Sequence, residues 1–100
     1  MAKPRGRKKK IRLVKSEPKV SQFSPRGRPG RPDEIELAVD QLEAIRLADY
    51  KGMKHWQACK FLGISRPTFT RILKSAHITI ADAIVNGKII RITGGSFKVG

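Results

Sequence analysis

Apolar residues recur at spacings of three and four along the second half of the chain, which is the pattern of an amphipathic helix. The longest such stripe contains Phe69, Ile72, Leu73, Ala76, Ile80, Ala83 and Ile84. It predicts a helix that begins near residues 65–67, with Ser65 or Pro67 marking its start, and that ends at Asn86 before Gly87. Three further apolar residues widen the arc in the C-terminal half of this helix beyond what a lone three-helix unit needs, namely Ile78, Ala81 and Val85.

Two shorter helices are expected upstream. The first covers about residues 41–50, with Asp40 as its N-cap and Glu43 completing a capping box. The second covers about residues 54–62 and lacks a good cap, because Lys54 stands where serine or threonine is preferred. Gly63 supplies the turn to the third helix, since glycine adopts positive φ without steric cost.

A short apolar run over residues 88–93 predicts a strand, and a single strand must pair with something. Its candidate partners are residues 11–14, residues 20–23, or the same strand of a second subunit. Together with the wide apolar arc of the third helix, the last option favours a homodimer.

These elements predict a mainly α fold, a three-helix helix-turn-helix domain with one to three short strands. The domain is expected over residues 33–100. Residues 1–32 are poor in apolar side chains and rich in Lys, Arg, Pro and Gly, so we expect a basic, largely flexible arm there.

The charge is extreme for 100 residues, with a net value of +14. The arm carries twelve lysines and arginines against Glu17 alone, whereas residues 33–50 sum to −5 and residues 51–87 to +5. Such a balance indicates a polyanionic partner. No apolar run approaches the ~20 residues of a membrane span, no secretory signal is evident, and Cys59 is alone. The expected location is therefore the cytoplasm, on the nucleoid.

Residues 58–74 have the layout of a helix-turn-helix, in which the second helix enters the major groove. Cys59 is a small residue four positions before Gly63, and apolar residues flank the glycine and face inward from the second helix. The outward positions predict contacts near base edges from Arg66, Thr68, Thr70 and Arg71, and contacts to phosphate from Lys74 and Ser65. The alternative is an ordinary helical hairpin with a solvated basic face.

An Arg-Gly-Arg motif occurs twice, at Arg5 and Arg7 and again at Arg26 and Arg28. The second copy resembles the AT-hook core Arg-Gly-Arg-Pro, whereas the first has Lys8 in place of the proline. These arginines are expected on phosphates or in a minor groove, where negative potential attracts arginine. The alternative is a solvated basic tail.

No catalytic or metal-binding set stands out. His55 and Cys59 are four residues apart, and only His77 adds a third candidate nitrogen ligand, whereas structural zinc normally has four ligands. Cys59 is better interpreted as a small apolar filler. We therefore expect no enzyme, no cofactor and no metal.

The chain resembles a family of bacterial and archaeal proteins, the domain-of-unknown-function family 134. The resemblance covers about residues 25–95 and rests on the segments 42–49, 63–69, 71–73, 75–76, 80–83, 86–88, 91–92 and 94–95. It implies a DNA-binding protein without a known target. The helix-turn-helix is also similar to that of the fourth region of bacterial sigma factors, which reads promoter DNA. The N-terminal segment lacks the cysteine that many family members carry, so no metal or redox role is implied.

The expected function is sequence-specific binding to double-stranded DNA, in the role of a transcriptional regulator. Residues 66–86 are the expected recognition helix in the major groove, with the basic arm on phosphates or in the minor groove. One alternative is a nucleoid-associated or RNA-binding protein with little sequence preference. Another is an adaptor that docks its acidic first helix on RNA polymerase. No membrane partner is expected.

Overall fold

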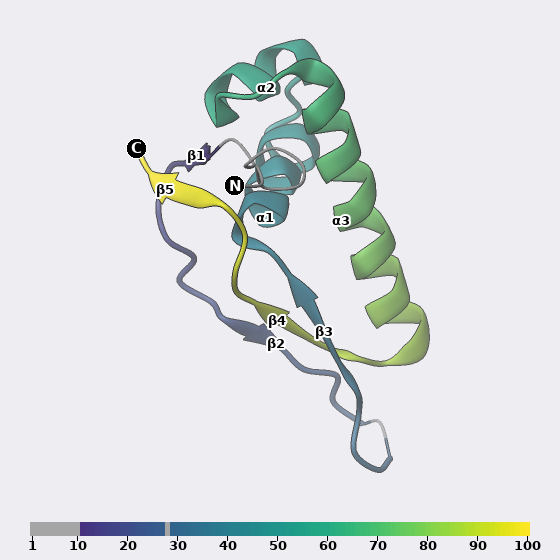
Figure 1. Ribbon diagram of the computed structural model, residues 1–100. Coiled ribbons are helices and arrows are strands. Elements are labelled where there is room, and N and C mark those ends of the chain that lie inside the picture. Colours follow the sequence, from purple (N-terminus) through teal and green to yellow (C-terminus); the bar gives the residue numbers. More distant parts are fainter. Residues whose placement is uncertain (1–10, 28) are drawn as a thin grey trace, which may run out of the picture.

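The computed structural model describes residues 11–27 and 29–100, in which helices pack beside short strands (Figure 1). The helical elements are α1 (Val39–Ile45), its π-helical continuation η1 (Arg46–Tyr50), α2 (His55–Leu62) and α3 (Arg66–Asn86). The strands are β1 (Arg12–Val14), β2 (Gln22–Phe23), β3 (Glu34–Leu37), β4 (Ile89–Ile92) and β5 (Phe97–Val99). The three predicted helices and the presence of short strands are confirmed, and with five strands in the described ranges the fold is a small mixed α/β domain where the sequence predicts a mainly α one. No described helix is long and apolar enough to cross a membrane.

The strands form two small sheets. In the larger one β4 is central, antiparallel to β2 and parallel to β3, so Ile90 is in register with Phe23 on one side and Ile35 on the other. In the smaller one β1 and β5 run parallel, with Leu13 beside Lys98. The strand predicted over residues 88–93 is confirmed, and it pairs within the chain with the predicted segment 20–23. The strands β3 and β5 were not anticipated.

Both β1 and β2 lie in the segment that the sequence assigned to a flexible arm. Val14 of β1 is only 2% exposed and belongs to the hydrophobic core, while β2 forms an edge of the larger sheet. The boundary drawn at residue 33 therefore does not separate these strands from the rest of the fold. The local composition is that of a disordered segment, but the pairing partners lie more than 60 residues away in sequence.

The start of α1 differs from the prediction. Its N-cap is Ala38, whose N–H donates to Oε1 of Gln41 at 2.7 Å. Asp40 is instead a buried residue of the first turn, with its carboxylate 3.5 Å from Nε of Arg12. Glu43 takes no part in a capping box and accepts hydrogen bonds from Arg46. The helix begins earlier because β3 ends at residue 37, so the chain turns into α1 directly after the strand.

The connection between α2 and α3 agrees with the sequence prediction. Gly63 has φ +71°, the left-handed conformation that glycine adopts without strain. Ser65 is the N-cap of α3, and its Oγ accepts from the Thr68 N–H at 3.4 Å. At the other end Gly87, with φ +63°, terminates the helix. Lys54 provides no side-chain cap for α2, as expected.

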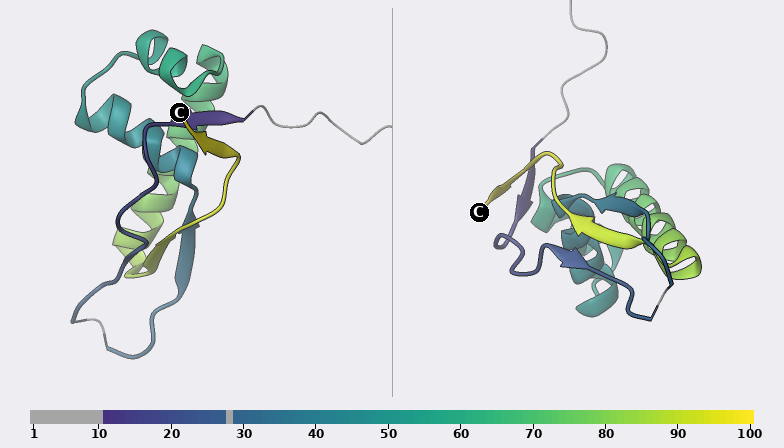
Figure 2. Two further views of the ribbon diagram at one scale, coloured as in Figure 1. Left: turned by 90° about the vertical axis from the view of Figure 1, so that its left-hand side faces the viewer. Right: turned by 90° about the horizontal axis from the view of Figure 1, so that it is seen from below.

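The core lies along one side of α3, where all other elements gather (Figure 2). Phe69 and Leu62 are its largest fully buried helical side chains, and the strands add Val14, Leu37 and Ile92. Ala58 and Cys59 are buried on α2, in keeping with the small residues that a close crossing of two helices requires. The opposite side of α3 faces solvent.

Candidate nucleic-acid interface

The first half of α3 brings together six of the ten residues predicted to contact DNA. Five of them are exposed, namely Ser65, Arg66, Thr70, Arg71 and Lys74, while Thr68 is half-buried. From Arg66 to Lys74 the helix rises by about 12 Å, at ~1.5 Å per residue. The set therefore forms one compact polar and basic surface directly after the α2–α3 turn.

Thr68 orients this surface. The Ser65 hydroxyl donates to Thr68 Oγ1 at 2.9 Å, and Nη2 of Arg71 donates to the same oxygen at 3.3 Å. Thr68 thus links the helix cap to the arginine one turn later. Only one Nη of Arg71 is used in this contact, so the rest of its guanidinium remains available to an acceptor outside the chain.

His55 is a member of this surface that sequence reasoning did not assign to it. Its Nδ1 lies 3.1 Å from Oγ1 of Thr70, and its ring meets the Phe69 ring edge-on at a centroid distance of 5.3 Å. The contact joins the start of α2 to α3. Because His55 and Thr70 are fifteen residues apart on different helices, no periodicity in the sequence signals it. Cys59 is buried, and the described residues contain no cluster of three metal-ligating side chains.

The positive charges on this surface have no acidic partners. Of the ion pairs that form across the described ranges 11–27 and 29–100, none includes Arg66, Arg71 or Lys74. On α2, the exposed Lys60 lies over the Trp56 ring at 5.3 Å from its centroid, so its charge also stays uncompensated by an acid. A surface of this kind has a positive potential that attracts anions.

The acidic residues, in contrast, are largely neutralised within the fold. The ion pairs are Asp40 with Arg12, Glu43 with Arg46, Asp82 with Lys88, and Glu34 with Arg91. Asp49 Oδ2 lies 2.6 Å from Nε2 of His77. Hydrogen bonds from Arg91 hold the pKa of Glu34 below its ordinary value, and hydrogen bonds from Lys88 and Asn86 do the same to the pKa of Asp82. The acidic segment at residues 33–50 therefore stabilises the fold more than it presents a free acidic surface.

Glu43 makes stability depend on pH. Burial raises the pKa of Glu43, but hydrogen bonds from Arg46 and from the Lys15 N–H outweigh burial, so the net pKa lies below 4.5. A lowered folded-state pKa contributes stability that is present above about 4.5 and is lost as the pH falls through the folded value.

Replacing Glu43→Gln should lower the unfolding free energy by about 1–3 kcal/mol near neutral pH, because hydrogen bonds to a charged group are lost. The difference from wild type should shrink as the pH falls below about 4.5. Urea unfolding over a pH series measures it, with the exposed Glu17→Gln as control. A difference that does not change with pH would contradict the role assigned to the Glu43 carboxylate.

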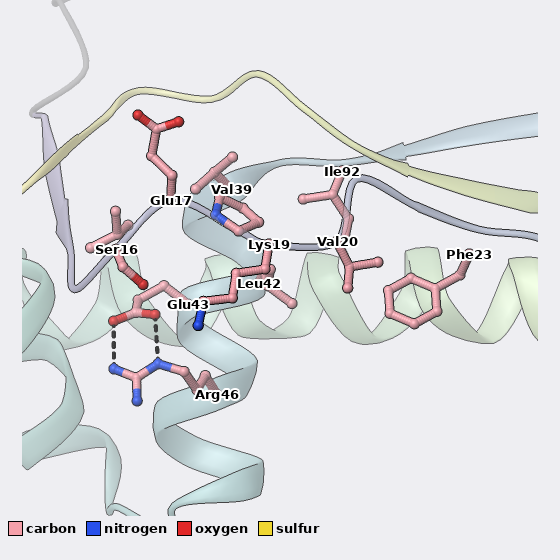
Figure 3. Close-up of a pocket in the computed structure, with 12 residues that line it drawn as sticks. Ser16, Glu17, Lys19, Val20, Phe23, Val39, Leu42, Glu43, Arg46 and Ile92 are labelled. Atoms are coloured by element: carbon pink, nitrogen blue, oxygen red, sulfur yellow. Dashed lines mark hydrogen bonds and ion pairs between the residues drawn. The ribbon is translucent and has the colours of Figure 1, made fainter.

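A cavity of about 340 Å³ lies between the segment 16–23 and α1 (Figure 3). Its wall is mostly apolar and includes Val39, Leu42 and Ile92, with Glu43 and Arg46 at one end. These two charged side chains face each other and are joined by two hydrogen bonds, so the polar end of the cavity is internally satisfied. None of the residues that line this cavity belongs to α3, so the cavity is separate from the basic half of that helix.

The described segments next to the two basic motifs lie at different ends of the molecule. Leu13 of β1 lies beside Gly63, with side-chain carbons 3.7 Å from the position that a Cβ would take there. The chain that precedes β1 is thus joined to the fold next to the α2–α3 turn. Arg26 is exposed and belongs to the connection between β2 and β3. This connection lies at the end of the molecule opposite α2 (Figure 1). The other three predicted arginines, Arg5, Arg7 and Arg28, lie outside the described residues.

Comparisons with known proteins agree on one family. The chain matches the family model "Protein of unknown function DUF134" over residues 1–100. It is 48% identical over 91 residues to a UPF0251 protein of Thermoanaerobacter pseudethanolicus, covering 90% of this chain and 77% of that protein. A UPF0251 protein of Caldanaerobacter subterraneus is 50% identical over 91 residues, with coverage of 90% and 77%. One from Methanococcus maripaludis is 46% identical over 96 residues, with coverage of 95% and 74%.

No solved structure matches the chain. The family match and the relatives show that this protein belongs to the family of proteins of unknown function DUF134, whose curated members are called UPF0251 proteins.

Proposed function

We propose that this protein binds double-stranded DNA with sequence preference and acts as a transcriptional regulator. In this proposal α2 and α3 form a helix-turn-helix similar to that of the fourth region of sigma factors. The first half of α3 reads the major groove, and the basic N-terminal residues hold the phosphate backbone.

The observation that carries the proposal is the uncompensated basic surface on the first half of α3. Arg66, Arg71 and Lys74 have no acidic partner among the described residues, whereas most acids of the chain are paired elsewhere. Solubility alone does not require unpaired basic side chains to be separated from the acidic ones in this way. Arginine that is exposed and oriented by a neighbouring hydroxyl, as Arg71 is by Thr68, suits a bidentate contact to guanine.

The rigidity of the α2–α3 unit supports readout of bases as well as phosphates. Leu62 and Phe69 are fully buried on either side of the Gly63 turn, and Ile64 is 8% exposed. The contact between His55 and Thr70 adds a polar link between the two helices. A recognition surface built on packed helices keeps its side chains in register with base edges better than a flexible loop does.

The N-terminal residues support a large non-specific contribution. Residues 1–10 contain six lysines and arginines and no acid. They precede β1, which lies beside Gly63 at the start of α3. Charges tethered there would neutralise phosphates close to the groove that α3 enters, and such neutralisation dominates protein–DNA affinity. In this proposal the protein acts on the nucleoid.

The alternative in which the protein docks its acidic first helix on RNA polymerase is less well supported. In α1 both Asp40 and Glu43 are buried, and each faces an arginine of the same chain. The nucleoid-associated or RNA-binding alternative differs from the proposal in having little sequence preference. Binding measurements that compare selected with random sequences distinguish the two.

Replacing Arg71→Ala should weaken binding to a selected duplex by about 1–3 kcal/mol and barely change binding to a random duplex. Arg71→Lys should restore little of that preference, because lysine keeps the charge but cannot form the bidentate contact. Fluorescence anisotropy with duplexes enriched by in vitro selection measures both affinities, with Lys98→Ala on β5 as an exposed cationic control.

Equal losses on selected and random duplexes would contradict base readout by Arg71 and favour the nucleoid-associated alternative. Full rescue by Arg71→Lys would assign the residue to phosphate. Tighter binding to structured or single-stranded RNA than to any duplex would overturn the proposal in favour of an RNA-binding protein.

A further inference from the structure

The outward stripe of α3 changes character halfway along the helix. In the first half it presents Arg71 and Lys74, and at the next positions of the same stripe it presents Ile78, Ala81 and Val85. The spacing of three and four residues keeps all five on one face. Ile78 is 60% exposed and Val85 is 80% exposed, so the chain itself leaves this apolar part uncovered.

The exposure of this stripe is not explained by an incomplete hydrophobic core. The inward face of the same half is complete, with Ala76 and Ala83 buried and Ile80 packed against the core. The views in Figures 1 and 2 place every other element on that inward side. Beyond the stripe Ile84 adds a further side chain that is 73% exposed. The apolar surface is thus contiguous along about two helical turns.

The stripe lacks the positive charge on which contacts to nucleic-acid phosphates depend. No lysine or arginine occurs between Lys74 and Lys88. Asp82, the acid in this interval, is held within the chain by Lys88 Nζ at 2.9 Å and by Asn86 Nδ2 at 2.7 Å. In a chain of net charge +14 this is a region where a second copy can approach without repulsion between like charges.

The pattern of side-chain sizes fits a second copy in particular. The small Ala81 lies between the larger Ile78 and Val85. Positions 78 and 85 are equally far from the midpoint between residues 81 and 82. An interface with two-fold symmetry must be complementary to itself, so that each residue meets its counterpart across the axis. With antiparallel helices, Ala81 of each copy lies near the axis and allows close approach, while Ile78 of one copy packs on Val85 of the other.

We propose that two copies of this chain associate through the C-terminal halves of their α3 helices, packed antiparallel about an axis near Ala81. The surface is small compared with the ~1,200–2,000 Å² of a stable interface, so the dimer should form at micromolar concentrations and not below.

The arrangement has a consequence that rests on the proposed DNA-binding function. The midpoint of the segment from Arg66 to Lys74 lies about eleven residues from the axis, which is about 17 Å along the helix at ~1.5 Å per residue. In the dimer the two basic halves are then about 35 Å apart, at opposite ends of the helix pair. This matches the ~34–36 Å between half-sites one turn apart on DNA, and predicts a palindromic site.

Replacing Ile78→Glu should weaken self-association, because a carboxylate would be buried opposite apolar side chains. Light scattering on the full chain without DNA, at about 1 to 200 µM, should show a mass that rises from 11.2 kDa towards twice that value for wild type. The matched control is Ile11→Glu, since Ile11 is 55% exposed and lies outside α3. The dimer dissociation constant of Ile78→Glu should be at least tenfold larger than that of the control.

Ala81→Cys provides a second measurement that does not depend on weakening the interface. In a background with Cys59 replaced by alanine, this variant should form a disulfide-linked dimer under mild oxidation, and Ser75→Cys, exposed on the same helix, should not. A monomeric wild type at 200 µM, or equal crosslinking at both positions, would overturn the proposal. A dimer that binds no DNA would instead leave this interface intact and contradict only the proposed function.

Discussion

Replacing Phe69→Ala should lower the unfolding free energy by about 3–5 kcal/mol. Phe69 is completely buried, and it is the largest side chain in the core between α2 and α3. Removing its ring costs the transfer free energy of the lost atoms and leaves a cavity that the surrounding helices fill only in part. For a domain of this size the loss is a large share of a total stability of about 5–15 kcal/mol.

The change should also disturb the candidate interface. Phe69 supports the ring of His55, whose Nδ1 lies near the Thr70 hydroxyl. Chemical denaturation measures the stability, and Phe69→Leu is the matched control, since it keeps most of the apolar volume and should cost less than about 1.5 kcal/mol. Similar losses of unfolding free energy for both variants would show that stability does not depend on the ring volume at position 69.

Deleting residues 1–10 should weaken binding to any DNA duplex by about 100-fold or more at low salt, under the proposed function. The deleted residues contain six lysines and arginines. If all six neutralise phosphates, the slope of log affinity against log salt should fall by up to about 5, at ~0.9 per phosphate. The preference for a selected duplex over a random one should be retained, because α3 is unchanged.

The cut at residue 10 matters, because a cut at residue 32 would also remove β1 and β2 and the buried Val14. The control is the unfolding free energy of the deletion variant, which should equal that of the full chain. A salt slope that does not change would exclude residues 1–10 from phosphate contact. Loss of sequence preference together with affinity would assign the specificity to these residues instead of α3.

The helical part of the fold was predictable because its signals are local. The stripe from Phe69 to Ala83 and the glycines at positions 63 and 87 set the limits of α3 to within a residue. The capping of α1 was not predictable in the same way. Asp40 is a good cap residue by type, but the pairing of β3 with β4 moved the start of the helix and left Asp40 in the first turn facing Arg12.

The strands depended on distant partners. Residues 12–14 and 22–23 lie in a basic, proline-containing segment that by composition does not fold, yet they pair with strands near the C-terminus. Likewise β3 contains Glu34 and Glu36, in the acidic segment for which the sequence predicts no strand. Arg91 on the adjacent strand neutralises Glu34, with both carboxylate oxygens within 2.9 Å of its guanidinium.

The candidate interface was only partly visible in the sequence. The basic and polar positions from Ser65 to Lys74 could be named because a helix of known start fixes which residues face outward. Which charges remain free was not visible, since contacts such as that of Asp49 with His77 join residues 28 apart. The contact of His55 with Thr70 was not visible either, because the two residues lie fifteen apart in sequence on different helices.

By itself the sequence determined the helices, the turn at Gly63, the excess of positive charge and the basic face of α3, because each depends on neighbours within one or two helical turns. Only the tertiary structure decided that β1 and β2 belong to the folded domain, which acids are neutralised, and that the apolar stripe on the second half of α3 is left uncovered. These depend on contacts between distant segments, whose free energy appears only when the whole chain packs together.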